Sequence, residues 1–207
     1  MKGESNPGNQ KGKMDVRFSK IWLSVSLFWT IAAAAGQNGN SVHLSIQYIG
    51  LTFHPGGGNL PEQYPLKLDR KGYLVLETGG VAGIDYYVRP YFFARFAGAF
   101  FLDCAQLPAG FIHIGIRGIM LKKQRHTISG GMGPTLIFRK DWHSLPGYNG
   151  DKFYDGRVFK GWQYRFILYG GEFEYSYKIS DKIRYQFSII PGYPFVITIK
   201  TGIGVKI

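Results

Sequence analysis

The feature that most constrains the fold of this chain is a period-two alternation of apolar and polar residues, repeated in blocks of about ten residues. Residues 110–121 show it most clearly. Three isoleucines alternate there with three other residues, in the order Ile112, His113, Ile114, Gly115, Ile116 and Arg117. Successive side chains of a β-strand point to opposite faces, so this block predicts a strand with one apolar face and one polar face.

Eight blocks of this kind follow one another after residue 40. They span residues 41–54, 73–88, 91–103, 110–121, 126–141, 163–177, 183–190 and 195–207. The connections after the first, third, fifth and seventh blocks have about 18, 6, 21 and 4 residues, whereas those after the second, fourth and sixth have about 2, 4 and 5. The seventh connection is the exception, because it is short. Long external loops that alternate with short turns are typical of outer-membrane barrels. The pattern predicts an all-β chain that forms an eight-stranded antiparallel up-and-down transmembrane barrel.

Composition excludes several other classes of protein. Aromatic residues make up 16% of the chain, too many for a disordered segment. The 29 glycines follow no period of three, which excludes collagen, and Cys104 is the single cysteine, which excludes a disulfide scaffold. A bundle of membrane-spanning helices is excluded as well, because only one long apolar run is present.

That apolar run, residues 21–35, predicts a secretory signal peptide. It reads IWLSVSLFWTIAAAA, follows the basic residues Arg17 and Lys20, and ends in small residues. We therefore divide the chain into an N-terminal extension and signal peptide, residues 1–36, and a barrel, residues 37–207. Translation starting at Met1 and translation starting at Met14 both agree with this interpretation.

The charge of the exported part favours a lipid partner. Five of the 25 basic and two of the 13 acidic residues precede residue 37, which leaves 20 and 11, a net charge of +9. A basic exported protein meets anionic lipid, and export argues against a nucleic-acid partner.

In its strand pattern the chain resembles the small eight-stranded outer-membrane barrels. The resemblance covers most of residues 41–207 and includes the C-terminal run 202–207, which is similar to the terminal strand signal of such barrels, with Ile207 where an aromatic residue is usual. It implies the outer membrane of a Gram-negative-type cell, contact with lipopolysaccharide and handling by the barrel-assembly machinery. The resemblance does not decide whether the protein also binds a partner protein outside the cell or in the envelope. The alternative is a soluble periplasmic ligand-binding barrel, although the first strand lacks the Gly-x-Trp of a lipocalin.

Charged residues on the polar faces predict a salt-bridge network inside the barrel. The expected members are Arg117, Arg165, Arg184, Glu172 and Glu174. Charges in a narrow lumen are costly unless they are paired. The pair Gly170-Gly171 interrupts the alternation of its strand, which predicts a β-bulge that turns both glutamates inward. An eight-stranded barrel filled in this way is too narrow for an open channel.

Polar residues near the external strand ends offer a candidate catalytic site. We assign it to His143, Asp141, Ser144, His54 and His113, because a histidine oriented by a carboxylate acts as a base near neutral pH. Some eight-stranded outer-membrane barrels are lipid A deacylases or acyltransferases that use His and Ser. In those deacylases the serine follows the histidine by two residues, whereas Ser144 follows His143 directly, so the two face opposite ways in a regular strand. The alternative is that these residues belong to the membrane interface and the loop.

The long loop at 142–162 offers a second kind of site. Its candidate binding residues are Tyr148, Tyr154, Arg157 and Lys160, which suit a lipopolysaccharide head group or a partner; the alternative is a lid over the barrel mouth. Scattered histidines without a His-x-x-x-His spacing predict no metal, and no cofactor motif is present. The leading prediction is a non-enzymatic outer-membrane protein that stabilises the envelope or binds a ligand through its loops. The hydrolase or acyltransferase is the alternative.

Overall fold

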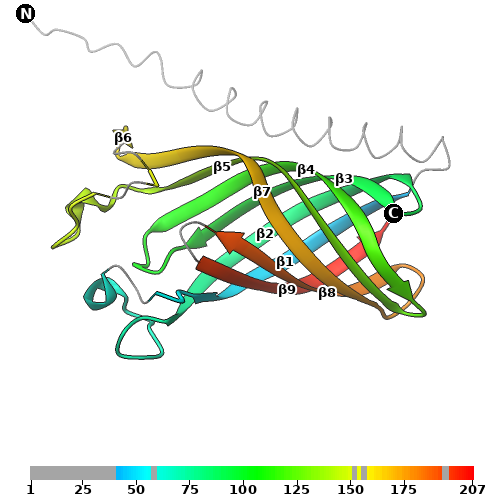
Figure 1. The fold of residues 1–207 in the computed structure, drawn as a ribbon, viewed down its shortest axis with the longest axis horizontal. Helices are drawn as coiled ribbons and strands as arrows, with labels where there is room; N and C mark the ends of the chain where they lie inside the picture. The colour runs from blue at the N-terminus through cyan, green and yellow to red at the C-terminus, as the bar shows by residue number, and fades with distance from the viewer. Residues whose placement is uncertain (1–40, 57–59, 151–152, 155–157, 193–195) are drawn as a thin grey trace, which may run out of the picture. The chain divides into compact units, whose positions relative to one another are not determined.

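The computed structural model describes residues 41–56, 60–150, 153–154, 158–192 and 196–207, and within them the chain forms a closed barrel (Figure 1). Its eight long strands are β1 (Val42–Phe53), β2 (Leu74–Arg89), β3 (Phe92–Leu102), β4 (Pro108–Lys123), β5 (His126–Lys140), β7 (Trp162–Lys178), β8 (Ile183–Gly192) and β9 (Val196–Lys206). Neighbours in sequence pair antiparallel, and pairing of β1 with β9 and of β5 with β7 completes the ring. The short β6 (Val158–Phe159) pairs with the start of β7.

The predicted eight-stranded antiparallel barrel is confirmed, and each predicted strand end lies within two residues of the observed one. Side chains of β4 show how the alternation is used. His113 and Arg117 are buried inside the barrel, whereas Ile114 between them is 56% exposed on the outside. The predicted signal peptide lies outside the described residues.

A change of register in β7 brings its two glutamates into the lumen. The pairing with β5 shifts between Ile167 and Gly170, where β7 carries one extra residue. Because an extra residue reverses the facing of everything beyond it, Glu172 and Glu174 both point inward and are buried. The bulge predicted from Gly170-Gly171 is confirmed.

The connections define two different ends of the barrel. Loops 54–73, 103–107 and 141–161 lie at one end, which we call the long-loop end; the turns 90–91, 124–125 and 179–182 lie at the other, the short-turn end. Two 3₁₀ turns, η1 (Pro61–Gln63) and η2 (Trp142–Ser144), belong to the long loops. A small hydrophobic core fastens these loops to the barrel: Tyr64, Val75, Cys104 and Trp142.

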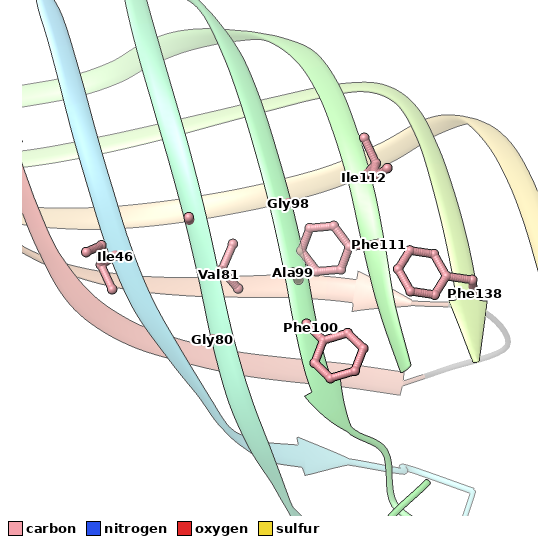
Figure 2. Close-up of a pocket in the computed structure, with 10 residues that line it drawn as sticks. Ile46, Gly80, Val81, Gly98, Ala99, Phe100, Phe111, Ile112 and Phe138 are labelled. Carbon is pink, nitrogen blue, oxygen red and sulfur yellow. The ribbon is translucent and has the colours of Figure 1, made fainter. Parts of the chain in front are cut away.

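The outer surface has a hollow across β1 to β5 (Figure 2). Gly80, Ala82 and Gly98 point outward from adjacent strands and present almost no side chain. The larger side chains of Ile46, Phe100 and Ile112 border them. The result is an apolar hollow of about 480 Å³, which we call the outer hollow.

Candidate functional site

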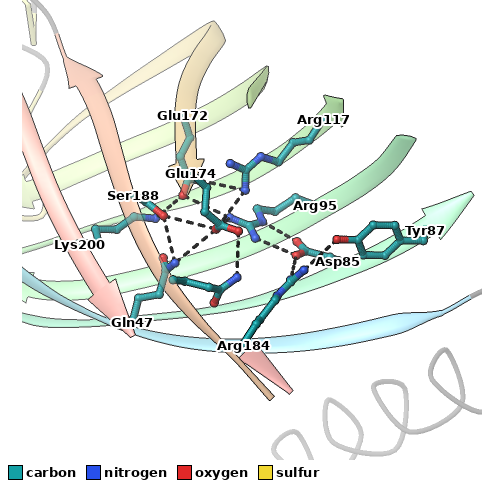
Figure 3. Close-up of polar contacts among 11 residues, drawn as sticks. Gln47, Asp85, Tyr87, Arg95, Arg117, Glu172, Glu174, Arg184, Ser188 and Lys200 are labelled. Carbon is teal, nitrogen blue, oxygen red and sulfur yellow. Dashed lines mark hydrogen bonds and ion pairs between the residues drawn. The ribbon is translucent and has the colours of Figure 1, made fainter. Parts of the chain in front are cut away.

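Arg95 is the centre of the charged lumen (Figure 3). It lies opposite Asp85 across the β2–β3 pair, and its Nε and Nη2 donate to the two carboxylate oxygens of Asp85 at 2.5 and 2.8 Å. Its Nη1 reaches across the lumen to β7, to Glu172 Oε1 at 3.2 Å and Glu174 Oε2 at 2.9 Å. The guanidinium therefore ties opposite walls of the barrel together.

Three further cations complete this group. Lys200 Nζ on β9 lies 2.9 Å from Glu172, Arg117 Nη1 on β4 lies 3.5 Å from Glu174, and Arg184 Nη2 on β8 lies 2.5 Å from Asp85 Oδ2. We call the seven charged residues the lumen network: Asp85, Arg95, Arg117, Glu172, Glu174, Arg184 and Lys200. Polar neighbours add to it, since Gln47 and Gln186 also donate to Glu174, whereas Nε and Nη2 of Arg117 have no hydrogen-bond partner. The paired ions fill the lumen and link the strands.

Sequence reasoning missed three of these seven residues: Asp85, Arg95 and Lys200. A signal for the first two was present, because they stand five residues before and five residues after Pro90 in the short β2–β3 turn, the spacing of a cross-strand pair. The sequence also predicts Arg165 in the network, but Arg165 Cζ lies 5.7 Å from the ring centroid of Phe153 instead. It precedes Glu172 by seven residues on β7, about 23 Å along a strand, so it belongs to the long-loop end.

A stacked arginine lies at the long-loop end. Arg139 at the end of β5 is sandwiched between Trp142 and Tyr154, with its Cζ 3.9 and 4.0 Å from the two ring centroids. Trp142 Nε1 donates to Asp103 Oδ2 at 2.7 Å, which joins loop 141–161 to loop 103–107. Cation–π stacking and a buried hydrogen bond hold the two loops together at the long-loop end.

Two ionisable groups of loop 103–107 have shifted pKa values. Burial raises the pKa of Asp103, although hydrogen bonds from the Leu107 backbone and from Trp142 act in the opposite direction. Burial also raises the pKa of the Cys104 thiol well above its ordinary value, with the neighbouring carboxylates adding to the effect. A thiol held in this way is a poor nucleophile.

The structure joins three of the predicted catalytic residues in the turn η2. His143 Nδ1 lies 2.6 Å from Asp141 Oδ1, which also accepts the His143 backbone N–H at 3.1 Å. Partial burial raises the pKa of Asp141, but these bonds outweigh it and leave the pKa below its ordinary value. Ser144 Oγ donates to the Asp141 carbonyl oxygen at 3.2 Å. The geometry supplies an exposed carboxylate-oriented imidazole, with the serine hydroxyl turned to the backbone.

The other two candidate histidines have different surroundings. His54, just after β1, stacks on Tyr64 with ring centroids 5.8 Å apart. Burial lowers the pKa of His54, and Asp69 opposes that effect. His113 faces the lumen from β4, where its Nδ1 lies 2.7 Å from Thr135 Oγ1. The imidazoles of His54 and His113 are thus part of internal packing, unlike the exposed ring of His143.

The candidate binding residues of loop 141–161 also include both internally packed and exposed side chains. Tyr154 is buried against Arg139, and the Tyr148 hydroxyl accepts hydrogen bonds from Arg139 Nη2 at 3.0 Å and Gln163 Nε2 at 3.2 Å. Both tyrosines therefore pack against residues of the strand ends and loops at the long-loop end, and the lid over the barrel mouth stays a prediction. Lys160 is exposed, and Arg157 lies outside the described residues.

Lys160 is part of a patch on the outer rim. Lys140 and Trp162 are cross-strand partners, with the ammonium 5.7 Å from the indole centroid, and Lys160 Nζ lies 5.2 Å from the ring centroid of Phe159. Phe138 packs edge-on against Trp162. We call these five residues the rim patch: Phe138, Lys140, Phe159, Lys160 and Trp162. It places two cations directly beside outward-facing aromatic rings.

Among the residues that the structure describes, no group of three or more histidine, cysteine, aspartate or glutamate side chains is arranged to hold a metal ion. In the same part of the chain no helix is long and apolar enough to cross a membrane.

Comparisons with solved structures found similar chains at low sequence identity. A structure from the de novo design of transmembrane β-barrels is 9% identical, with a TM-score of 0.37 over 81% of this chain and 95% of that chain. Two structures of Ail, the attachment invasion locus protein of Yersinia pestis, have TM-scores of 0.42 over 81% of this chain and 97% of theirs. One is 11% identical and holds the heparin analogue sucrose octasulfate; the other is 10% identical.

No protein-family model matches the sequence, and neither does any curated protein. The strand pairing of the chain defines its class: it resembles the small eight-stranded outer-membrane barrels in strand number, antiparallel order and closure.

Proposed function

We propose that this protein is an integral outer-membrane β-barrel with a plugged lumen, and that its long-loop end binds anionic lipid head groups. The observation that carries the proposal is the inversion of the barrel wall. Charged side chains are buried inside, whereas large apolar side chains are exposed outside, as in Ile114, Phe166 and Ile203. Soluble monomers rarely expose apolar patches beyond a few hundred Å², and a continuous apolar band around a closed barrel fits a hydrocarbon surrounding.

The lumen network supports a plug rather than a pore. Arg95 and Glu174, both about 2% exposed, meet at 2.9 Å in the middle of a barrel that is narrow by its strand number. A solute passing through would have to separate ion pairs that are out of contact with water, at a cost of several kcal/mol. We therefore assign the lumen a stabilising role.

The membrane assignment is tested by heat-dependent gel mobility and by flotation with vesicles. A folded membrane barrel migrates faster unheated than boiled, and it floats with lipid on a density gradient. Equal mobility, together with recovery in the soluble fraction, would favour the soluble periplasmic barrel instead.

The rim patch supports the lipid part of the proposal. Its aromatic rings suit the boundary between hydrocarbon and water, and Lys140 and Lys160 are exposed beside them. Each lysine near an anionic surface contributes about 1 kcal/mol to the attraction. A lipid phosphate above the outward face of β5 and β7 would meet both ammonium groups.

The lipid part is tested with the folded protein in detergent, titrated with purified lipopolysaccharide. The double variant Lys140→Gln, Lys160→Gln is expected to bind roughly ten- to thirtyfold more weakly, and the difference should shrink at high salt. The matched control replaces Lys178 and Lys182 at the short-turn end. Equal loss in both double variants would mean that only net charge matters and would remove the rim patch from the proposal.

A second candidate function is a lipid-modifying hydrolase or acyltransferase. The observation that favours it is the exposed His143–Asp141 pair at the long-loop end, with 2.6 Å between Nδ1 and Oδ1. An imidazole oriented by a carboxylate can act as a general base. Lipid A mass spectra should then show one acyl chain lost or gained in cells with the intact protein, and no change with His143→Ala. The control is His126→Ala at the short-turn end; identical spectra in all cells would exclude this acyl chemistry.

A further inference from the structure

The outer hollow is a defect in an otherwise filled lipid-facing surface. A Cβ added at Gly98 would meet no atom within 4 Å, and at Gly80 it would meet only the Gln47 carbonyl oxygen, at 3.8 Å. Gly110 on the next strand also points outward, but the ring of Phe138 folds over it to within 2.6 Å of the same position. The chain therefore covers one outward glycine with its own aromatic ring and leaves two open.

The position of the outer hollow suits the tail of a lipid. Gly98 precedes the end of β3 by four residues and Gly80 follows the start of β2 by six, so both lie about 13–20 Å from the long-loop end along their strands. A strand tilt of about 35–45° reduces this to roughly 10–15 Å of depth. The outer hollow thus falls near the middle of an apolar band about 25 Å tall, within reach of a lipid tail.

From these observations we infer that the outer hollow binds one acyl chain of an anionic lipid, an inference that rests on the membrane location proposed above. Its lining is apolar and carries no titratable group. The loop that joins β1 and β2, the strands of Ile46 and Gly80, carries the exposed cations Arg70 and Lys71, which suit a phosphate head group.

A second copy of the chain fits the outer hollow less well. In a two-fold symmetric contact centred here, each copy presents the same patch, so one concave surface would face another. The void between them would cost free energy, as an unfilled cavity does in a protein core. A flexible chain follows the contour between Ile46, Phe100 and Ile112 without such a void.

The test is photo-crosslinking of the folded protein in phosphatidylglycerol vesicles that contain a trace of phosphatidylglycerol with a diazirine on its acyl chain. Labelled peptides are then mapped by mass spectrometry. We expect labelling to concentrate on residues 80–82 and 98–100, and Gly98→Ile, which fills the outer hollow, to abolish that preference. The matched control is Gly118→Ile, since Gly118 also points outward on β4 and a Cβ there meets only the Tyr91 carbonyl oxygen, at 4.0 Å.

Three outcomes would overturn the inference. Uniform labelling of the outer surface, or labelling unchanged in Gly98→Ile, would show that no chain occupies the outer hollow. A wild-type dimer in sedimentation that Gly98→Ile converts to a monomer would assign this surface to a second copy. Failure of the proposed function is distinguished by flotation, because a protein that floats with vesicles but shows no preferential labelling contradicts only the acyl-chain inference.

Discussion

The two faces of one barrel wall are built from neighbouring residues and have opposite chemistry. On β3, Arg95 is 2% exposed within an ion network, whereas the next residue, Phe96, is 46% exposed on the outside. In a soluble protein the aromatic ring would be buried and the arginine exposed. In the membrane location proposed above, the surroundings of the barrel, rather than its own core, supply most of the apolar contact.

Ion pairs stabilise the inner face of the barrel wall. The outer face depends instead on the medium that surrounds the barrel. Arg95 binds three carboxylates on two opposite strands, so its removal leaves buried charges without a partner. Ile114 outside contributes only if hydrocarbon surrounds it. The following predictions separate these two sources of stability.

Replacing Arg95 by Met is expected to cost about 3–5 kcal/mol of unfolding free energy, because Asp85, Glu172 and Glu174 each lose a cation in a dry lumen. Arg95→Lys keeps the charge and should lose less, since a single ammonium cannot bind Asp85 through two parallel bonds. Urea unfolding in lipid vesicles measures both variants. Unchanged stability of Arg95→Met would contradict a stabilising lumen network.

Replacing Ile114 by Arg on the outer face is expected to cost about 2–4 kcal/mol in a bilayer, because the charge falls near the middle of the apolar band. The control is Leu68→Arg in loop 54–73, a leucine of similar exposure (58%) outside the strands, where the change should be nearly neutral. The same vesicle unfolding assay applies. Equal stability of the two variants would mean that the outer face meets water.

The stability of loop 54–73 at the long-loop end should depend on pH through His54. Burial lowers the pKa of His54 in the folded state, while Asp69 partly opposes this. The unfolded loop therefore binds a proton more readily, so stability is complete above the ordinary pKa of about 6.5 and is lost as the pH falls from there to the folded pKa. Limited proteolysis of loop 54–73 should be faster at pH 5.5 than at pH 7.5. His54→Phe keeps a ring on Tyr64 and should remove the pH dependence; an unchanged dependence would assign it to another group.

The smallest effect is expected at an exposed ion pair of the short-turn end. Lys178 Nζ lies 2.6 Å from Asp181, but Asp181 is 94% exposed. Such a surface pair contributes about 0–1 kcal/mol, so Lys178→Ala should leave the vesicle unfolding curve almost unchanged. A loss as large as that of Arg95→Met would show that burial is not what distinguishes the lumen network.

Local pattern was enough to predict the strands and one bulge. Successive side chains of a strand face opposite ways, so the facing of a residue can be read from its immediate neighbours in the sequence. The ends of the eight strands were therefore predicted to within two residues. Gly170-Gly171 likewise marked a change of facing along its own strand. The His143–Asp141 contact was harder to predict, because it depends on the turn η2, in which Asp141 caps the backbone and also meets the His143 ring.

Sequence by itself determined which residues face the lumen and which face outward, because facing follows from position along a single strand. Only the tertiary structure decided which residues meet across the lumen. Lys200 binds Glu172 and Arg165 lies at the far end of the same strand as Glu172, a distinction set by barrel closure and strand stagger. The outer hollow likewise depends on three small residues of two adjacent strands coming together, and register between strands places them there.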